Sequence, residues 1–399
     1  MHRPRVINND GLRNKMNEKT VVVVFPSLFS LNKIDYLISS IHAVLKTKKL
    51  TFSKIRKNDS VIIVEAEDPV FASSAINYLF GIEKIAIAKE IENKFNVLVS
   101  TIATIGANLL LKDERFYVRV DGIKTEYLPK DVELAATSAL IEKTLDLQTK
   151  PGTEFNHDKI IYTYLTKSHA YVCIFIDKGS GGIPYKSQNK KVLCCIYDEL
   201  SAISCIQTLK MGFDVKILVC YNSESELLNL AKMLNQILYR FIQTKIELYF
   251  CKIDMKSAGR SILLKIAIIT DILVTLAKRN KIDGISLAIS SSIFPSWFIE
   301  YNTKHVIQKN VIPWFPLLGA DNNIFEIVKE CGLEKHSSKI ENLCKMKFKK
   351  DLLRNKIDKV SQISLRNIRT ITIELGSKNV HNIIDSLKSK HREFKRETS

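Results

Sequence analysis

The chain has 399 residues and carries 60 Lys and Arg against 42 Asp and Glu, a formal net charge of +18. Hydrophobic residues make up 46% of the chain and charged residues 26%. This composition is typical of soluble globular domains and excludes a largely disordered chain. A positive surplus of this size attracts polyanions and disfavours acidic partners. A solvated lysine surface on a protein with no polyanionic partner is the alternative explanation.

No segment has the length and apolarity of a membrane span, so we expect no membrane association. The polar residues 1–19 lack the apolar core of a signal peptide and predict a basic, disordered arm. Eight cysteines occur without a Cys-x-x-Cys pair or an accompanying histidine spacing, so we expect no metal site. Most of them lie in apolar runs, which favours free thiols in a reducing, cytoplasmic setting.

Residues 20–83 alternate between strand and helix patterns and predict a small ferredoxin-like domain. The expected elements are a strand at Thr20–Phe25, a helix at Asn32–Leu45, a strand at Ser60–Glu65 and a helix at Asp68–Phe80. A second α/β unit is expected over residues 84–178. Its elements are strands at 85–91, 115–120, 159–165 and 170–176, with helices at 101–111 and 132–145.

A third unit follows the glycine-rich linker Gly179–Pro184 and is expected over residues 179–344. Apolar strand patterns alternate there with helical patterns, which predicts a Rossmann-like, doubly wound parallel sheet with helices on both faces. In such sheets, ligands bind at the carboxyl ends of the strands, where the strand order reverses. Residues 345–399 form a basic extension that is either a solvated tail or a phosphate-contacting one.

Several segments in a fixed order resemble the tRNA 4-thiouridine synthetase (tRNA sulfurtransferase) family. They are Phe80-Gly81-Ile82, Tyr117–Val120 with Val132–Ile141, Gly181–Pro184 with Lys191–Leu193, and Pro316–Asp321 with Cys331-Gly332. The resemblance implies that the second unit is a THUMP domain, which binds tRNA. It also implies that the third is a PP-loop ATP-pyrophosphatase-type domain. The layout is similar to the shorter form of the family, which has no rhodanese domain.

The sequence departs from the family at the positions that the resemblance assigns to the nucleotide. A phosphate loop needs glycines so that backbone N–H groups can approach phosphates. The corresponding loop here runs Tyr197-Asp198-Glu199-Leu200-Ser201, without glycine and with two carboxylates. In the family's later nucleotide-binding segment, which maps onto 289–298, only Ser291 is retained. The full degenerate nucleotide set is Ile196, Tyr197, Asp198, Glu199, Ser201, Val219, Cys220, Ile289 and Phe298.

Cys344 occupies a place comparable to that of the family's sulfur-handling cysteine. Lys345 and Lys347 stand beside it and are expected to favour the thiolate by lowering the thiol pKa. The alternative is a structural cysteine without chemistry.

Basic residues around the Tyr117–Val120 strand are the candidate RNA contacts, since a THUMP-like domain presents a basic face to phosphates. The five candidates are Lys112, Arg115, Arg119, Lys124 and Lys130. We therefore expected the basic N-terminal half to carry the RNA affinity. Solvated side chains without a partner are the alternative.

The leading functional hypothesis is a tRNA-binding protein of tRNA modification in which the ATP-dependent step is lost, so that no cofactor is expected. One alternative is an active tRNA sulfurtransferase that uses ATP and Mg²⁺ and takes sulfur from a donor protein. Another is a non-catalytic partner of an active paralogue, with the apolar segment Ile293–Ile299 as interface; the alternative is that this segment is core. A homodimer is compatible with each of these hypotheses.

Overall fold

The structure is a computed structural model that describes residues 19–124, 126–254, 261–320, 324–350, 352–376 and 378–387. The chain divides into two compact units, which are treated separately below. Unit 1 contains residues 19–31, 48–77 and 82–179, and unit 2 contains residues 32–47, 78–81 and those from Ser180 onward. The expected N-terminal arm, apart from Lys19, lies outside the described residues.

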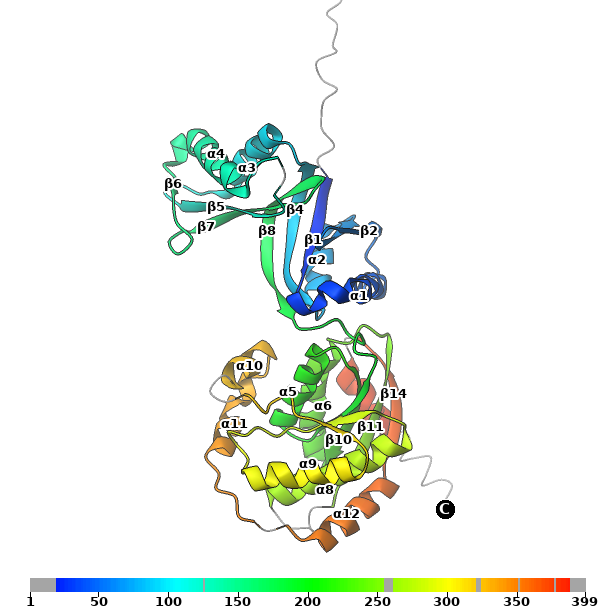
Figure 1. Cartoon of the computed structure of the whole chain (residues 1–399). Helices are drawn as coiled ribbons and strands as arrows, with labels where there is room; N and C mark the ends of the chain where they lie inside the picture. The colour runs from blue at the N-terminus through cyan, green and yellow to red at the C-terminus, as the bar shows by residue number, and fades with distance from the viewer. Residues whose placement is uncertain are drawn as a thin grey trace, which may run out of the picture. The chain divides into compact units, whose positions relative to one another are not determined.

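Unit 1 is built on one eight-stranded sheet with the order β2-β3-β1-β4-β8-β7-β5-β6 (Figure 1). The strands are β1 (Lys19–Pro26), β2 (Phe52–Asn58), β3 (Val61–Ala66), β4 (Ile82–Glu92), β5 (Arg115–Gly122), β6 (Lys150–Pro151), β7 (Lys159–Leu165) and β8 (His169–Gly181). The order β2-β3-β1-β4, with each neighbouring pair antiparallel, is that of a ferredoxin-like sheet. The expected fold class of this part is therefore confirmed.

Helices cover unit 1 where the strands turn apolar side chains toward them. Helix α2 (Pro69–Asn77) packs against β1, β3 and β4, and helices α3 (Phe95–Leu109) and α4 (Pro129–Lys143) pack together near β5. Residues of β5 alternate strictly, with Phe116, Val118 and Val120 buried in a core shared with α3 and α4. The intervening Arg115, Tyr117 and Arg119 therefore point to the opposite face.

Two features of unit 1 differ from the expected elements. Strand β2 was not expected, because its polar sequence Phe-Ser-Lys-Ile-Arg-Lys-Asn lacks the apolar alternation of a covered strand and lies at the sheet edge. Strand β4 pairs along its length with β1, so the two expected N-terminal domains share a single sheet. Their boundary near residue 83 stays a prediction, as do the other domain limits.

Unit 2 contains a six-stranded sheet with the order β13-β12-β9-β10-β11-β14. The strands are β9 (Lys191–Ile196), β10 (Asp214–Tyr221), β11 (Lys245–Lys252), β12 (Gly284–Ser286), β13 (Ile312–Trp314) and β14 (Arg369–Glu374). The first five are parallel to their neighbours, and β14 adds an antiparallel edge to β11. This confirms the Rossmann-like, doubly wound sheet.

Helices lie on both faces of this sheet, as Figure 1 shows. They are α5 (Glu199–Lys210), α6 (Glu224–Leu238), α8 (Ile262–Arg279), α9 (Ser296–Gln308), α10 (Ile324–Glu330), α11 (Ser337–Cys344) and α12 (Arg354–Arg366). Helix α1 (Ile34–Thr47) also groups with this unit, and Lys33, just before it, donates to the Ser187 carbonyl oxygen at 3.2 Å. No helix among the described residues is long and apolar enough to cross a membrane.

The glycine-rich entrance to unit 2 has a steric reason. Gly182 has a φ of +77°, and a Cβ placed on it would lie 2.4 Å from the Lys210 carbonyl oxygen. Only glycine fits this close approach between the linker and the end of α5. Directly beyond it, the chain enters β9, the strand from which the sheet grows in both directions. The carboxyl end of β9 is therefore the switch point at which a ligand site is expected.

Candidate functional site

The sheet brings the predicted nucleotide-contact residues to one edge of unit 2. Ile196 ends β9, Tyr197 and Asp198 connect it to α5, and Val219 and Cys220 lie near the end of neighbouring β10. Ile289 follows β12 on the other side of β9, and Phe298 lies in the first turns of α9. The predicted residues therefore lie at one edge of the sheet, and their role as nucleotide ligands stays a prediction.

The loop between β9 and α5 is closed by its own hydrogen bonds. The backbone N–H groups of Tyr197 and Asp198 each donate to Ser201 Oγ at 2.9 Å. The Ser201 N–H donates in turn to Asp198 Oδ1 at 2.8 Å, so Asp198 caps the N-terminus of α5. A phosphate bound at this helix end would need these N–H groups. The loop offers them to its own side chains instead.

The second carboxylate of the loop is neutralised from another helix. Glu199 is buried and forms an ion pair with Lys339 of α11. No sequence motif joins these two residues, because 140 positions separate them. Lys265 of α8 adds a second cation nearby, bonded to Glu226 at 2.9 Å and lying 5.8 Å from the centre of the Tyr197 ring.

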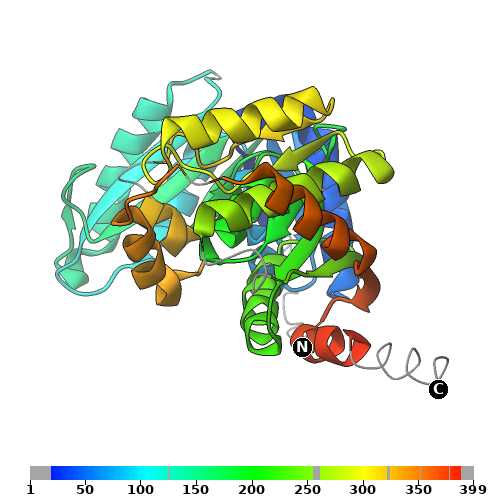
Figure 2. The same ribbon diagram turned by 90° about the horizontal axis from the view of Figure 1, so that it is seen from below.

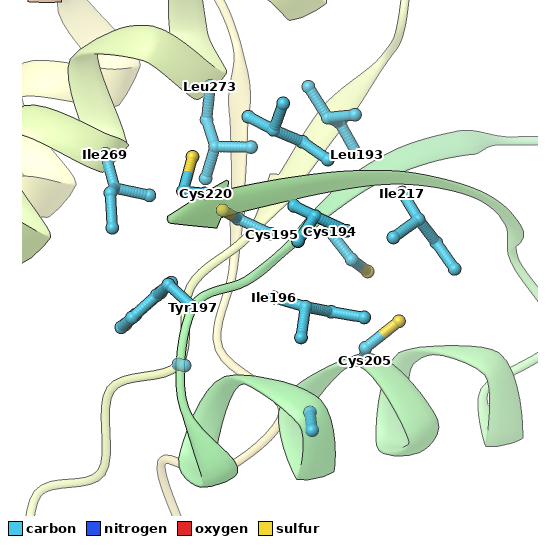
Figure 3. Close-up of a cluster of buried hydrophobic side chains, with 14 of the residues drawn as sticks. Leu193, Cys194, Cys195, Ile196, Tyr197, Cys205, Ile217, Cys220, Ile269 and Leu273 are labelled. Carbon is cyan, nitrogen blue, oxygen red and sulfur yellow. The ribbon is translucent and has the colours of Figure 1, made fainter. Parts of the chain in front are cut away.

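Side chains of the chain itself fill the remaining contact positions. Ile196, Val219, Cys220, Ile289 and Phe298 are fully buried, with 0% exposure each. Figure 3 shows Ile196 and Cys205 between the sheet and α5, with Cys195 and Cys220 on the other side of the sheet near Ile269 and Leu273 of α8. These positions are core.

Burial also governs the acidity of groups in this region. It raises the pKa of the Asp198 carboxyl above its ordinary value, although hydrogen bonds from Ser201 act in the opposite direction. Burial likewise raises the pKa of the Cys195 and Cys220 thiols. Neutral thiols packed in a core are poor nucleophiles and poor metal ligands. Among the described residues, no group of His, Cys, Asp and Glu is arranged to hold a metal ion.

The segment corresponding to the family's later nucleotide-binding motif is also engaged within the chain. Ser291, the retained family position, donates from Oγ to the Leu318 carbonyl oxygen at 2.7 Å. Ser290 and Ser292 both donate to the Ala320 carbonyl oxygen, at 2.9 and 3.1 Å. The segment 290–292 is therefore hydrogen-bonded to Pro316–Asp321, one of the segments that resemble the family.

The hypothesis that Ile293–Ile299 is an exposed protein interface is wrong, and the alternative that it is core is confirmed. Ile293, Phe294 and Phe298 are 7%, 3% and 0% exposed and belong to the main core of unit 2. Their apolar side chains pack inward because this segment leads into α9, which covers the sheet beside α8.

Cys344 ends α11 and is the one exposed cysteine of the eight. The expectation that neighbouring lysines lower its thiol pKa is wrong. Partial burial raises that pKa, and the Glu341 carboxylate raises it further, while the Cys344 backbone N–H acts in the opposite direction. Its role in sulfur chemistry stays a prediction.

The five candidate RNA contacts of unit 1 are placed near β5, but three of them are ion-paired. Arg115 pairs with Asp158 at 3.3 Å, and Lys130 pairs with Glu133 at 2.7 Å. Arg119 pairs with both Asp121 and Glu154, at 3.1 and 2.8 Å. Lys112 and Lys124 form no ion pair with a described residue.

The charge distribution corrects the expectation of a basic N-terminal half. Residues 19–179 carry 21 Lys and Arg against 19 Asp and Glu, which leaves them almost neutral. Residues 345–399 carry 15 Lys and Arg against 6 Asp and Glu, half of the surplus of the whole chain. The total charge and a few clustered basic side chains therefore do not indicate where the surplus lies.

A buried polar contact that the sequence does not reveal joins three helices. Asp271 of α8 accepts from Ser361 Oγ of α12 at 2.5 Å, and it lies 3.0 Å from His305 Nε2 of α9. Both partners bond to the carboxylate and the serine does not bond to the histidine, so the arrangement lacks the serine–histidine bond of a nucleophilic triad. It fastens α9 and α12 to α8.

Known proteins with similar sequences and folds agree with the resemblance stated above. Two curated relatives, the probable tRNA sulfurtransferases of Methanosarcina mazei and Methanosarcina acetivorans, are each 24% identical over 189 residues. The match covers 47% of this chain and 46% of each relative, so the chain spans about half the length of the curated relatives it matches. No family model matches the chain.

Two solved structures share the fold. One is a 4-thiouridine synthetase in complex with RNA and ATP, with a TM-score of 0.66 and 13% identity over 90% of this chain and all of the other. The second is the protein PH1313 of Pyrococcus horikoshii, with a TM-score of 0.60 and 18% identity over 78% of this chain and 98% of the other. The resemblance to the tRNA sulfurtransferases is confirmed, and the fold is the one it implies.

Proposed function

We propose that this protein binds tRNA and acts in tRNA modification without binding ATP at the edge of its Rossmann-like sheet. The relatives are named as probable tRNA sulfurtransferases, and a protein of the same fold has been solved with RNA. These likenesses support tRNA as the partner. A protein that presents tRNA to an active enzyme, or that holds it during modification, fits this proposal.

The hydrogen-bonded loop between β9 and α5 is the observation that supports the proposed loss of ATP binding. Ser201 Oγ accepts from two backbone N–H groups, and Asp198 caps the helix that would receive a phosphate. A triphosphate would have to displace these bonds and approach two carboxylates. Lys339 offsets the charge of Glu199, so the repulsion comes from ionised Asp198. Two unit charges 4 Å apart interact by roughly 4 kcal/mol at an effective dielectric of 20, and one such repulsion would weaken binding about a thousandfold.

An active sulfurtransferase is the competing function. It requires the loop to open and a Mg²⁺ ion to offset the charge of Asp198 and Glu199. The pairing of Glu199 with Lys339 argues against this function, because a carboxylate that already has a cationic partner is not free to hold Mg²⁺. The raised pKa of the Cys344 thiol also disfavours a resting thiolate for sulfur transfer.

Filter binding of the full chain to tRNA at several salt concentrations tests the proposed partner. We expect affinity to fall steeply with salt, with a slope of about −0.7 to −0.9 per phosphate contact. Duplex DNA of equal length is the matched competitor. If tRNA does not bind at low salt, or binds no better than the duplex, the proposed function is wrong.

A further inference from the structure

A run of exposed lysines follows α11, the helix whose Lys339 pairs with Glu199 at the closed loop. Residues 345–350, here called the lysine segment, follow α11 directly and lead toward α12. Their sequence is Lys-Met-Lys-Phe-Lys-Lys. Lys345, Lys347 and Lys349 are exposed, and none of the three forms an ion pair with a residue that the structure describes.

Aromatic packing fixes the lysine segment on the surface of unit 2. The Phe348 ring stacks against buried Phe294, with ring centres 5.5 Å apart. Lys350 lies over the Trp297 ring, 5.8 Å from its centre. Because Phe294 and Trp297 lie between β12 and the start of α9, the segment is held near the carboxyl edge of the sheet. An anchored segment loses less conformational entropy on binding than a free tail does.

Positive charge continues from the lysine segment onto α12. This helix packs against α8, as Figures 1 and 2 show, and buries Ile357, Val360 and Leu365. Its exposed residues include Lys356, Lys359 and Arg366. Of the basic side chains in this helix, Arg354 is paired with Asp358, at 3.9 Å.

Phosphate binding needs cations that are not already neutralised. In unit 1, three of the five candidate RNA contacts are held by carboxylates, and residues 19–179 are almost neutral. The lysine segment has neither disadvantage. A lysine without an internal partner can neutralise a phosphate of a polyanion. The counterion that this phosphate held is then released, and its release drives binding.

We propose that the lysine segment binds the phosphate backbone of RNA, so that unit 2 supplies a major part of the salt-sensitive affinity. The proposal rests on the proposed function, since it assigns the RNA contact surface. Lys345, Lys347 and Lys349 contact phosphates, while Phe348 positions them through Phe294. These contacts read no sequence and set the position of the RNA at the edge of the sheet.

The test compares charge reversal at this segment with an equal reversal elsewhere in the full chain. The test variant is K345E/K347E/K349E. The control is K48E/K54E/K57E, at three lysines of unit 1 that are exposed and have no described ion pair. Both variants lose the same total charge, so a non-specific effect of net charge is equal in the two. Circular dichroism melting checks that both variants fold.

We expect the test variant to lose about tenfold or more in tRNA affinity at moderate salt, and its salt slope to fall by about 2 to 3 units. The control should change affinity and slope much less. A second variant, F348A, should weaken binding while leaving the salt slope near the wild-type value, because it removes no charge. Equal losses in test and control variants would overturn the proposal while leaving tRNA binding in place.

Failure of the wild-type protein to bind tRNA would overturn the proposed function together with this surface. Anionic lipid vesicles containing phosphatidylserine are a further arm of the experiment. Binding of the wild type to these vesicles but not to tRNA would assign the segment to a membrane surface and contradict the proposal.

Discussion

The Lys339 ammonium group forms an ion pair with the Glu199 carboxylate, joining α11 to the first turn of α5. Glu199 is buried, whereas the Lys339 side chain is 61% exposed. The pair therefore closes the loop at the carboxyl end of β9 from outside. Lys339 is thereby engaged by a carboxylate of the protein and not by a phosphate.

Removal of the lysine should destabilise unit 2. We expect Lys339→Met to lower the free energy of unfolding by about 1 to 2 kcal/mol, because the Glu199 carboxylate stays buried after losing its cationic partner. Urea unfolding measures the effect. Lys335→Met, at a nearby exposed lysine, is the control and should be nearly neutral. The double variant E199Q/K339M should recover part of the loss, and an unchanged stability of Lys339→Met would show that the pair contributes nothing.

The contact between Asp271, His305 and Ser361 should make stability depend on pH in acid. Burial alone would raise the pKa of the Asp271 carboxyl, but the hydrogen bonds from His305 and Ser361 outweigh it, so the pKa lies below its ordinary value. A carboxyl whose pKa is depressed in the folded state stabilises that state above the unfolded pKa, about 3.9. This contribution is lost as the pH falls from there through the folded pKa.

Asp271→Asn should therefore be less stable than the wild type at pH 7 and at pH 5 by a similar amount. The difference should shrink only below about pH 4. Urea unfolding across this range, with D385N at an exposed aspartate as a surface control, provides the measurement. A difference that disappears already near neutral pH would mean that a histidine, and not this carboxyl, dominates the linkage.

Within unit 1, the lysines without ion pairs should contribute more to tRNA binding than the paired arginines. We expect K112A/K124A to reduce the salt slope of binding by about 1.4 to 1.8 units if both contact phosphates. Arg115→Ala and Arg119→Ala should each have a smaller effect, because Asp158 and Glu154 already neutralise these side chains. The reverse ranking would show that the ion pairs open when RNA binds.

Cys344 should be the thiol that reacts in the folded protein. Seven of the eight cysteines are buried, so a thiol-specific reagent should modify one group in native conditions and eight in denaturant. Because the pKa of the Cys344 thiol is raised, the reaction should be slow at neutral pH and should accelerate into the alkaline range. Cys344→Ser should abolish the native reaction, and rapid modification near pH 6 would indicate a functional thiolate instead.

The sequence predicted the strands, helices and sheets of this protein better than the partners of its surface side chains. The β-branched run Val21–Val24 and the apolar run Leu193–Ile196 identify buried strands, because side chains of these kinds pack well in the core of a sheet. The switch point at the end of β9 follows from the strand order of the sheet, which these runs do not reveal. The polar strand β2 escaped detection, since an edge strand does not need an apolar pattern.

The site itself depended on partners that are distant in sequence. Nothing near Glu199 indicates Lys339, and nothing near Arg119 distinguishes an RNA contact from the partner of Glu154. The adjacent lysines at Cys344 gave the wrong direction for its pKa, because burial and Glu341 outweigh them. Local sequence therefore predicted where charged side chains lie in the fold, but not which side chains form ion pairs with them.

Titration calorimetry of the purified full chain with ATP and Mg²⁺, in the presence and absence of tRNA, tests the central claim most directly. We expect no saturable heat of ATP binding at millimolar concentrations, while tRNA alone should give a salt-sensitive binding isotherm. Micromolar ATP affinity, accompanied by tRNA-dependent release of pyrophosphate, would contradict it.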